Sequence, residues 1–397
     1  MLTSRAALRA LLLRQQGLLG DRVSGGAGGA VAWTRRQGFL PLELQAHALA
    51  PGHDLVMLYR VSNYQLGSLD MFLYDGGQLF EHCLHLPGAL PASDYNLIYD
   101  PEKIAAAARP GSPGALVLEF LDEEGPATVR ELQALLRRHS LTDRRAVARV
   151  IHELYAGGAI LISHREGNLE SYDLASRVLP GLADGALPLG ARLRALARRA
   201  LQVLAPVTRA TLSQALNSIG LRSRLDLVAM KCQKSRIVAE MLAEGEIVQL
   251  EVEDPPERYL VPASWLPHLG SAPRSSNPRI AFLSPIDPVV WDRRRARDLF
   301  GFDVRPLESP SAIEQRRFGP HPLAILYGQA LVGLLEPQMR WSHDRLVIHG
   351  IHVWDHALLE DHHFRTAFGE AVRELAAFHE ARDIQGARSL PPRLLPS

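Results

Sequence analysis

The hydrophobic and polar positions of the chain repeat with a spacing of 87 residues. At that spacing the stretch 151–163 matches 238–250, with glutamate, glycine and isoleucine at equivalent positions. Each copy predicts an amphipathic helix that ends at a glycine, followed by an apolar strand, a polar turn and a second strand. A helix that leads into a two-stranded wing is typical of the end of a winged helix-turn-helix. We therefore expect two such units in tandem.

The residues upstream of each copy predict the remaining helices of such a unit. In the first copy, Thr128 and Glu131 form the capping-box pattern of a helix start, and 144–155 corresponds to a recognition helix. Matching helices of the second copy are expected at 200–204, 211–219 and 225–243. The two units are expected at 112–178 and 188–264. Winged helices bind nucleic acid in many proteins and other proteins in some, so the fold alone leaves both uses open.

A different pattern begins after a linker at 266–278, which is rich in proline and serine. Beyond the linker the apolar runs are shorter and predict strands that precede one long closing helix. Strands are expected at 279–283, 321–327, 330–336 and 345–349, and the helix at 362–382. We interpret 279–397 as a small α+β domain.

Composition places the chain among globular proteins. It has 397 residues, of which 47% are hydrophobic and 22% charged, enough to build several buried cores. No run approaches 18 apolar residues, and Arg5, Arg9 and Arg14 interrupt the apolar stretch at the N-terminus. We therefore expect a cytoplasmic protein without a membrane partner, and we take it to be a monomer. Cys83 and Cys232 are too few for a disulfide framework.

The charge is unevenly distributed although the net charge is only +1. The segment 190–239 has ten basic residues and one acidic residue, a local charge of +9, and the following segment 240–257 is acidic. Such a separation favours a surface that faces a polyanion such as double-stranded DNA. The candidate DNA contacts in the basic segment are Arg222, Arg224, Lys231 and Lys234.

Several separated motifs resemble one family of DNA-repair enzymes. Residues 282–295 read FLSPIDPVVWDRRR, and LFGF, a glutamate and RRFG follow at 299–302, 308 and 316–319. In the N-terminal third, the matching strings are QGFL at 37–40, HDLVMLYR at 53–60 and LFEHCLH at 79–85. Together, in this order, they resemble the winged-helix DNA glycosylases of the crosslink-repair and alkylpurine family.

The resemblance covers nearly the whole chain and implies a fold. By its implication, 1–110 is a winged-helix-like domain that carries the catalytic motif, and 279–397 is rich in β-strands. The expected fold class is therefore α+β and helix-rich, with tandem winged helix-turn-helix units and a C-terminal β-rich domain. The implied activity is that of a monofunctional DNA glycosylase, which hydrolyses the N-glycosidic bond of alkylated or crosslinked purines.

The candidate catalytic motif departs from the family pattern. The family has glutamine, an apolar residue and then glutamine or aspartate, whereas this chain has Pro41-Leu-Glu43, or Glu43-Leu-Gln45 in a shifted register. Other departures are Cys83 in place of a tryptophan, Pro320-His321 in place of an aromatic pair, and Leu334 in place of an arginine. The first glutamine is absent in both registers. A non-catalytic DNA-binding protein, for lesion recognition or transcriptional regulation, is therefore the alternative function.

A purine alkylated at N7 is cationic and leaves without a general acid, so the protein needs only to activate water and stabilise positive charge. Glu43 is the candidate base, and Gln45 could hold the water in the shifted register. As an alternative, Glu43 is an ordinary charge near a helix start. His85 matches a family position and is our third catalytic candidate.

The remaining candidates are DNA contacts. His53 matches a family position and either approaches DNA or fills a hydrogen bond in the core. Arg60 and the run Arg293-Arg294-Arg295 are candidate phosphate contacts, with a solvated arginine surface as the alternative, which a run of three fits well. The RRFG string adds Arg316 and Arg317.

Neither a metal nor a cofactor is expected. His82, Cys83 and His85 lie close in sequence, and His352 and His356 are four residues apart, but the chain lacks CxxC and HExxH motifs. It also lacks the glycine-rich motifs GxGxxG and GxxxxGK[ST] that bind nucleotide phosphates.

Overall fold

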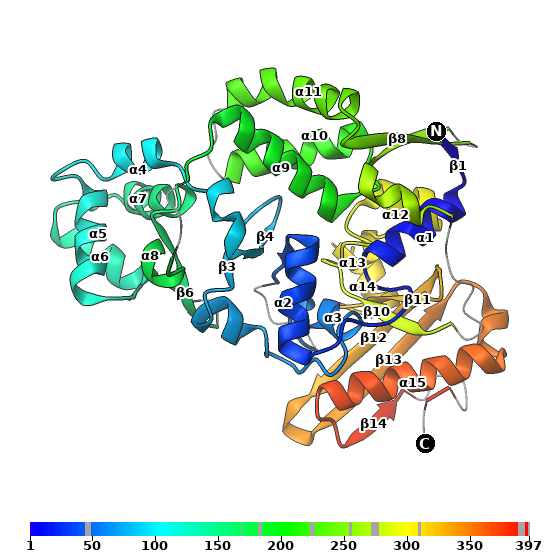
Figure 1. Cartoon of the computed structure of the whole chain (residues 1–397). Coiled ribbons are helices and arrows are strands. Elements are labelled where there is room, and N and C mark those ends of the chain that lie inside the picture. The colour runs from blue at the N-terminus through cyan, green and yellow to red at the C-terminus, as the bar shows by residue number, and fades with distance from the viewer. Residues whose placement is uncertain are drawn as a thin grey trace.

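The computed structural model describes residues 1–43, 49–167, 169–181, 185–222, 227–253, 256–270, 278–308, 311–387 and 394–395. Helices and small sheets alternate along the chain, and a larger sheet forms its C-terminal part (Figure 1). The fold class is α+β and helix-rich, as the sequence predicts.

The N-terminal part surrounds a small antiparallel sheet of order β2-β4-β3. Its helices are α1 (Arg5–Gln15), α2 (Gly26–Gln37), α3 (Gly52–Leu58) and α4 (Pro101–Ala107), with a π-helical turn η1 (Met71–Asp75) and a 3-10 helix η2 (Ala92–Leu97). Its strands are β1 (Leu2–Thr3), β2 (Leu40–Pro41), β3 (Leu79–Cys83) and β4 (Pro87–Pro91). Helix α1 begins where the side chain of Ser4 caps the backbone N–H of Ala7, and its leucines are buried in the same core as the C-terminal sheet.

The first repeat has the predicted three helices and hairpin, with an additional short strand between its first two helices. Its elements are α5 (Pro113–Glu124), β5 (Ala127–Thr128), α6 (Val129–Arg138), α7 (Arg144–Ala156), β6 (Ile160–Glu166), β7 (Leu169–Leu174) and α8 (Ala175–Val178). The sheet order is β5-β7-β6, and the capping box of Thr128 and Glu131 starts helix α6. Val117, Leu132 and Ile151 are buried in a core confined to this unit.

The second repeat has the same order with one addition. Its elements are α9 (Leu189–Leu204), α10 (Arg209–Arg222), α11 (Leu227–Ala243), β8 (Ile247–Val252), β9 (Glu257–Pro262) and the 3-10 helix η3 (Ala263–His268). Val207 bridges to Leu260 where the first repeat has strand β5. Strand β1 adds in parallel to β8, so the start of the chain completes this wing. The sequence repeat does not predict this addition.

The C-terminal part is a sheet of order β10-β11-β12-β13-β14, with helix α15 across it (Figure 1). The strands are β10 (Ile280–Leu283), β11 (Leu323–Tyr327), β12 (Ala330–Arg340), β13 (Arg345–Val353) and β14 (Asp383–Gly386). The helices are α12 (Arg293–Phe300), α13 (Arg305–Glu308), α14 (Ala312–Phe318), η4 (Trp341–His343), η5 (His356–Leu359) and α15 (His362–Phe378). Strands β12 and β13 are longer than predicted, because a bulge between Glu336 and Pro337 keeps them paired past the proline.

Candidate active site

A cleft of about 480 Å³ opens where four separate segments of the chain meet. The segment after β2 and helix α3 form one wall, η1 and the loop before it form another, and the tips of two hairpins, β6–β7 and β12–β13, border the opening. The polar side chains among the lining residues are Glu43, His53, Asp54, Asp70, Tyr74, Arg165 and Trp341.

Glu43 leads from strand β2 into this cleft. Pro41 pairs with Gly88 inside the sheet, so Glu43 follows a strand end. Its backbone N–H donates a long hydrogen bond, 3.4 Å, to Nδ1 of His53. Its carboxylate packs against Gly52 at the start of α3, because a Cβ built on Gly52 would overlap Oε2 of Glu43. The carboxylate that the sequence singles out therefore lies in the cleft, fixed at the contact with α3.

His53 belongs both to the cleft wall and to the core. It is 8% exposed, and its Nε2 lies 4.0 Å from Oδ2 of Asp54. Burial lowers the pKa of His53 to about 4, although Asp70 and Glu43 oppose that shift. The imidazole is therefore neutral at pH 7, and its Nδ1 is the acceptor for the backbone N–H of Glu43.

Two further carboxylates line the cleft, and the sequence patterns do not single them out. Asp54 is buried and accepts hydrogen bonds from the Tyr64 hydroxyl at 2.6 Å and from the Gly67 N–H at 3.3 Å. Asp70 also lines the cleft and is an exposed residue, and desolvation raises the pKa of both Asp54 and Asp70. Asp70 comes from a loop with no recognisable motif, whereas Asp54 directly follows His53 in a family-like string.

The cation in the cleft wall is already paired. Arg165, from strand β6, donates to both oxygens of Glu81, with Nε 2.7 Å from Oε2, and to Glu170 at 2.9 Å. The Tyr74 hydroxyl also donates to Glu81, at 3.1 Å. Since Arg165 is compensated by two carboxylates outside the lining, the lining itself has an excess of negative charge.

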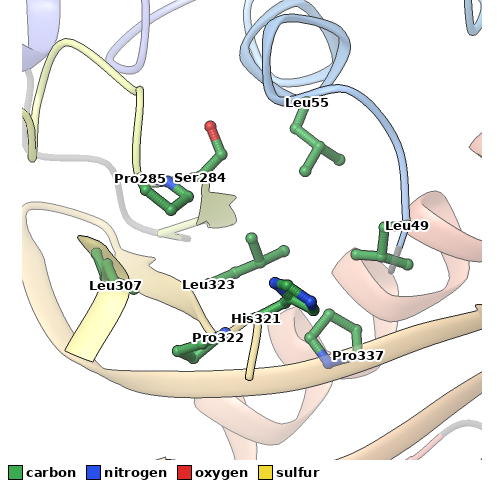
Figure 2. A pocket seen from close by; sticks show the side chains of 9 residues that line it. All are labelled: Leu49, Leu55, Ser284, Pro285, Leu307, His321, Pro322, Leu323 and Pro337. Carbon is green, nitrogen blue, oxygen red and sulfur yellow. The ribbon is translucent and has the colours of Figure 1, made fainter. Parts of the chain in front are cut away.

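A small apolar cavity of about 30 Å³ adjoins the cleft at Leu49, which lines both spaces. Figure 2 shows Leu55 above this cavity and the side chains of His321 and Leu323 below it. Pro322 and Pro337 complete the lower wall.

His85 lies elsewhere, in the turn between β3 and β4. It is 4% exposed, and its ring meets Trp291 edge to face, with centroids 4.6 Å apart, and also contacts Phe39. Burial, with a contribution from Arg222, lowers its pKa to about 3. Its Nδ1 has no hydrogen-bond partner among the described residues. The geometry does not bring His85 into the cleft, and its catalytic role stays a prediction.

Arg60 does not reach the surface, which corrects its interpretation as a phosphate contact. It is fully buried at the end of α3. Its guanidinium pairs with Asp287 at 2.8 and 2.9 Å, donates to the carbonyl of Gln16 at 2.8 Å and lies over the ring of Trp33. Arg60 therefore ties α3 to the loop after β10.

The arginine run in the C-terminal part is divided between surface and core. Arg295 is fully buried, whereas Arg293 and Arg294 are exposed and border an open groove of about 540 Å³ beside Trp291. Arg294 pairs with Glu257. Arg317 is exposed and lies over the ring of Phe318, and its role as a DNA contact stays a prediction.

Carboxylates pair with five of the ten basic residues in the segment 190–239, which weakens the argument from its local charge. Ion pairs join Arg192 to Asp100, Arg194 to Glu244 and Glu246, Arg198 to Glu246, Arg199 to Asp94, and Arg236 to Glu240. Three of these carboxylates come from the acidic segment that follows it.

The other predicted contacts are distributed as follows. Arg222 and Lys231 are exposed, and Lys234 donates to Ser213 and Asn217, each at 2.8 Å. Arg222 lies beside Cys83 and His85. Gln45, Arg224 and the side chain of Arg316 lie outside the described residues.

Within the described part of the chain, no group of three or more histidine, cysteine, aspartate or glutamate side chains could hold a metal ion. The helices described there include none long and apolar enough to span a membrane.

Comparison with known proteins identifies the class of protein. The sequence model of a family described as "DNA glycosylase AlkZ-like" matches residues 41–378. The chain therefore belongs to the AlkZ-like DNA glycosylases. Its fold is similar to the solved structure of the Streptomyces sahachiroi DNA glycosylase AlkZ, with a TM-score of 0.61 at 14% sequence identity, covering 98% of this chain and 100% of that one. Family and fold together support a DNA-binding repair glycosylase.

Proposed function

We propose that this protein is a monofunctional DNA glycosylase that removes cationic alkylated purines from duplex DNA. The observation that carries the proposal is the position of Glu43, whose carboxylate is fixed in an acidic cleft that also contains Asp54 and Asp70. A purine alkylated at N7 or N3 carries a positive charge, and a lining with excess negative charge favours it over a neutral base.

The same arrangement suits hydrolysis of the glycosidic bond. As the base departs with the bonding electrons, the sugar becomes an oxocarbenium-like cation. In this proposal Glu43 orients a water molecule and takes its proton as that water attacks the sugar. His53, held neutral by burial, keeps the backbone of Glu43 in place through its Nδ1. The departing cationic base becomes neutral and needs no general acid.

Lysine chemistry is not part of this proposal. The chain has three lysines, Lys103, Lys231 and Lys234, and none of them is among the described residues that line the cleft. Without an amine to form a Schiff base with the sugar, the reaction ends at an abasic site in an intact strand. A duplex crosslinked through purine N7 atoms has the same cationic leaving group and is a second candidate substrate.

The test is release of free base from a duplex with a single N7-methylguanine. We expect release by the wild-type protein in the presence of chelator, and a rate lower by about a hundredfold or more in Glu43→Gln, the scale of a lost general base. Glu166→Gln, an exposed carboxylate of the β6–β7 hairpin outside the lining, is the control. An unchanged rate in Glu43→Gln would remove Glu43 from the mechanism.

One observation favours the alternative, a non-catalytic protein that recognises lesions or regulates transcription. Pro41 occupies the position of the family's first glutamine and is paired inside the β2–β4 ladder, so no amide side chain is present there. Tight binding to an alkylated duplex without base release by the wild-type protein would support this alternative.

A further inference from the structure

The turn between helices α6 and α7 carries positive charge without nearby compensation. From position 137 to 149 the chain has five arginines and a single acid, Asp143. All five guanidinium groups belong to exposed residues, and none has an ion pair within the described part of the chain. We call this set the α6–α7 arginine surface: Arg137, Arg138, Arg144, Arg145 and Arg149.

The acid within this segment is already engaged. Asp143 caps helix α7 by accepting a hydrogen bond from the backbone N–H of Arg145 at 3.0 Å. Its carboxylate therefore stabilises the helix start, as an N-cap does in any surface helix. The remaining charge of the turn faces solvent.

The arginines share one end of the helix pair. Arg137 and Arg138 end α6, and Arg144 and Arg145 begin α7. On α7, Arg145 and Arg149 are four residues apart and so lie on one face. That face is opposite the one that buries Val147 and Ile151 in the core.

The second repeat differs from this surface in the ion pairs of its arginines. There, five of the arginines in the predicted basic segment are paired with carboxylates. An arginine that is already ion-paired must lose that partner before it can bind a phosphate, whereas an unpaired one needs only to release bound anions. Five arginines of the second repeat thus have carboxylate partners, whereas the five of the α6–α7 arginine surface have none within the described part of the chain.

The same unit also reaches the candidate active site. Its hairpin β6–β7 contributes Arg165 and Gly167 to the lining of the cleft. In helix-turn-helix proteins the second helix enters a groove of the duplex while the preceding helix crosses the backbone. A duplex with a lesion in the cleft would then continue along the unit that carries the α6–α7 arginine surface.

We propose that the α6–α7 arginine surface binds the phosphate backbone of the duplex that flanks the lesion, and that the ion-paired arginines of the second repeat add little to this binding. The identity of the partner rests on the proposed function. The location of the binding surface rests on the exposure of the five arginines and on the pattern of ion pairs in the two repeats.

The test compares two triple charge reversals on an undamaged duplex. The first is Arg137→Glu with Arg145→Glu and Arg149→Glu. The matched control is Arg236→Glu with Arg258→Glu and Arg382→Glu, three exposed arginines that pair with Glu240, Glu251 and Asp344. Both variants change the net charge equally, and melting temperatures verify that both are folded.

We expect the first variant to bind the duplex at least about tenfold more weakly at 100 mM salt, and the slope of log affinity against log salt to fall by about 2.7, the value for three phosphates. The control variant should retain affinity within about threefold, in line with the small worth of exposed ion pairs. Equal losses in both variants, or unchanged binding in the first, would overturn the proposal.

Base release separates this inference from the proposed function. When enough enzyme is present to bind all of the N7-methylguanine duplex, the first variant should release base at the wild-type rate. The reason is that the arginine surface is outside the cleft. If the wild-type protein releases no base and the first variant still loses duplex binding, the α6–α7 arginine surface does bind DNA and the glycosylase proposal is wrong. If the wild-type protein releases base and the first variant binds normally, only the surface is wrong.

Discussion

Gly52 and Glu43 are in contact across the cleft wall, with no room for a side chain between them. A Cβ on Gly52 would overlap Oε2 of Glu43 and would also approach Ile286 to 2.9 Å. The first residue of α3 thus decides where the carboxylate of Glu43 can lie. A glycine here is explained by this contact and not by a left-handed backbone conformation.

Gly52→Ala should therefore displace the Glu43 carboxylate and slow base release by about tenfold or more, since misplacing a catalytic group by about 1 Å is costly. Duplex affinity should stay within a few-fold, because the contact is inside the cleft. Gly28→Ala is the matched control, as a Cβ there meets nothing within 4 Å. A Gly52→Ala protein with wild-type base release would show that the contact does not position the carboxylate.

Asp70 gives a second prediction about the cleft. Its carboxylate and that of Glu43 both act electrostatically on His53. The substitution Asp70→Asn should lower the rate of base release by about three- to tenfold, because negative charge that stabilises the oxocarbenium-like sugar is lost. The rate is measured with enough enzyme to bind all of the duplex. Asp75→Asn, at the other end of η1 and outside the lining, should leave the rate unchanged. Equal rates in the two variants would exclude Asp70 from the chemistry.

Most elements of the fold can be predicted from the sequence where the patterns that define them are local. The 87-residue repeat predicts the helices and hairpins of both units, and the Thr128 and Glu131 pattern starts α6 where expected. Strand β1 was not predictable, because two residues carry no periodicity and their partner is about 250 positions away.

The candidate site can be predicted from the sequence only in part, because some of its residues have partners that are distant along the chain. Glu43 follows a recognisable entry to a motif, whereas Asp70 enters the cleft from an irregular loop. Arg60 looked like a surface contact because its ion-pair partner, Asp287, is 227 positions away along the chain. The local charge of 190–239 misled us similarly, since Arg192 and Arg199 find partners about 100 residues earlier, in Asp100 and Asp94. Charge counts within a segment cannot include partners that only folding brings close.

The buried pair of Arg60 and Asp287 yields a prediction about stability. Asp287→Asn leaves the buried guanidinium without its carboxylate partner, and removing one partner of a buried ion pair typically costs about 3–5 kcal/mol. We expect a lower free energy of unfolding by that amount in urea denaturation. The salt dependence of duplex binding by the folded fraction should be unchanged, because Arg60 does not contact phosphate. An unchanged free energy of unfolding would show that the pair does not stabilise the packing of α3 against the loop after β10.

His85 gives a prediction about the stability of the protein at acid pH and about its rate of base release. Its pKa is lowered to about 3 in the folded protein, against an ordinary value of 6.5, so between these values the unfolded chain binds a proton that the native protein excludes. Stability therefore falls as the pH drops below 6.5, and at pH 5 this group alone removes about 2 kcal/mol.

His85→Leu should abolish that part of the loss. Because Nδ1 of His85 has no partner among the described residues, an apolar side chain there should cost little stability at pH 7. The measurement is urea denaturation at pH 7 and pH 5, with a smaller difference between the two expected in His85→Leu than in the wild type. Base release by the variant at pH 7 should stay within a few-fold of wild type, since His85 packs against Trp291 and Phe39 and is not among the described residues lining the cleft. A large loss of base release with normal folding would instead establish the catalytic role that the sequence predicts for His85, and would require the cleft to extend to the turn between β3 and β4.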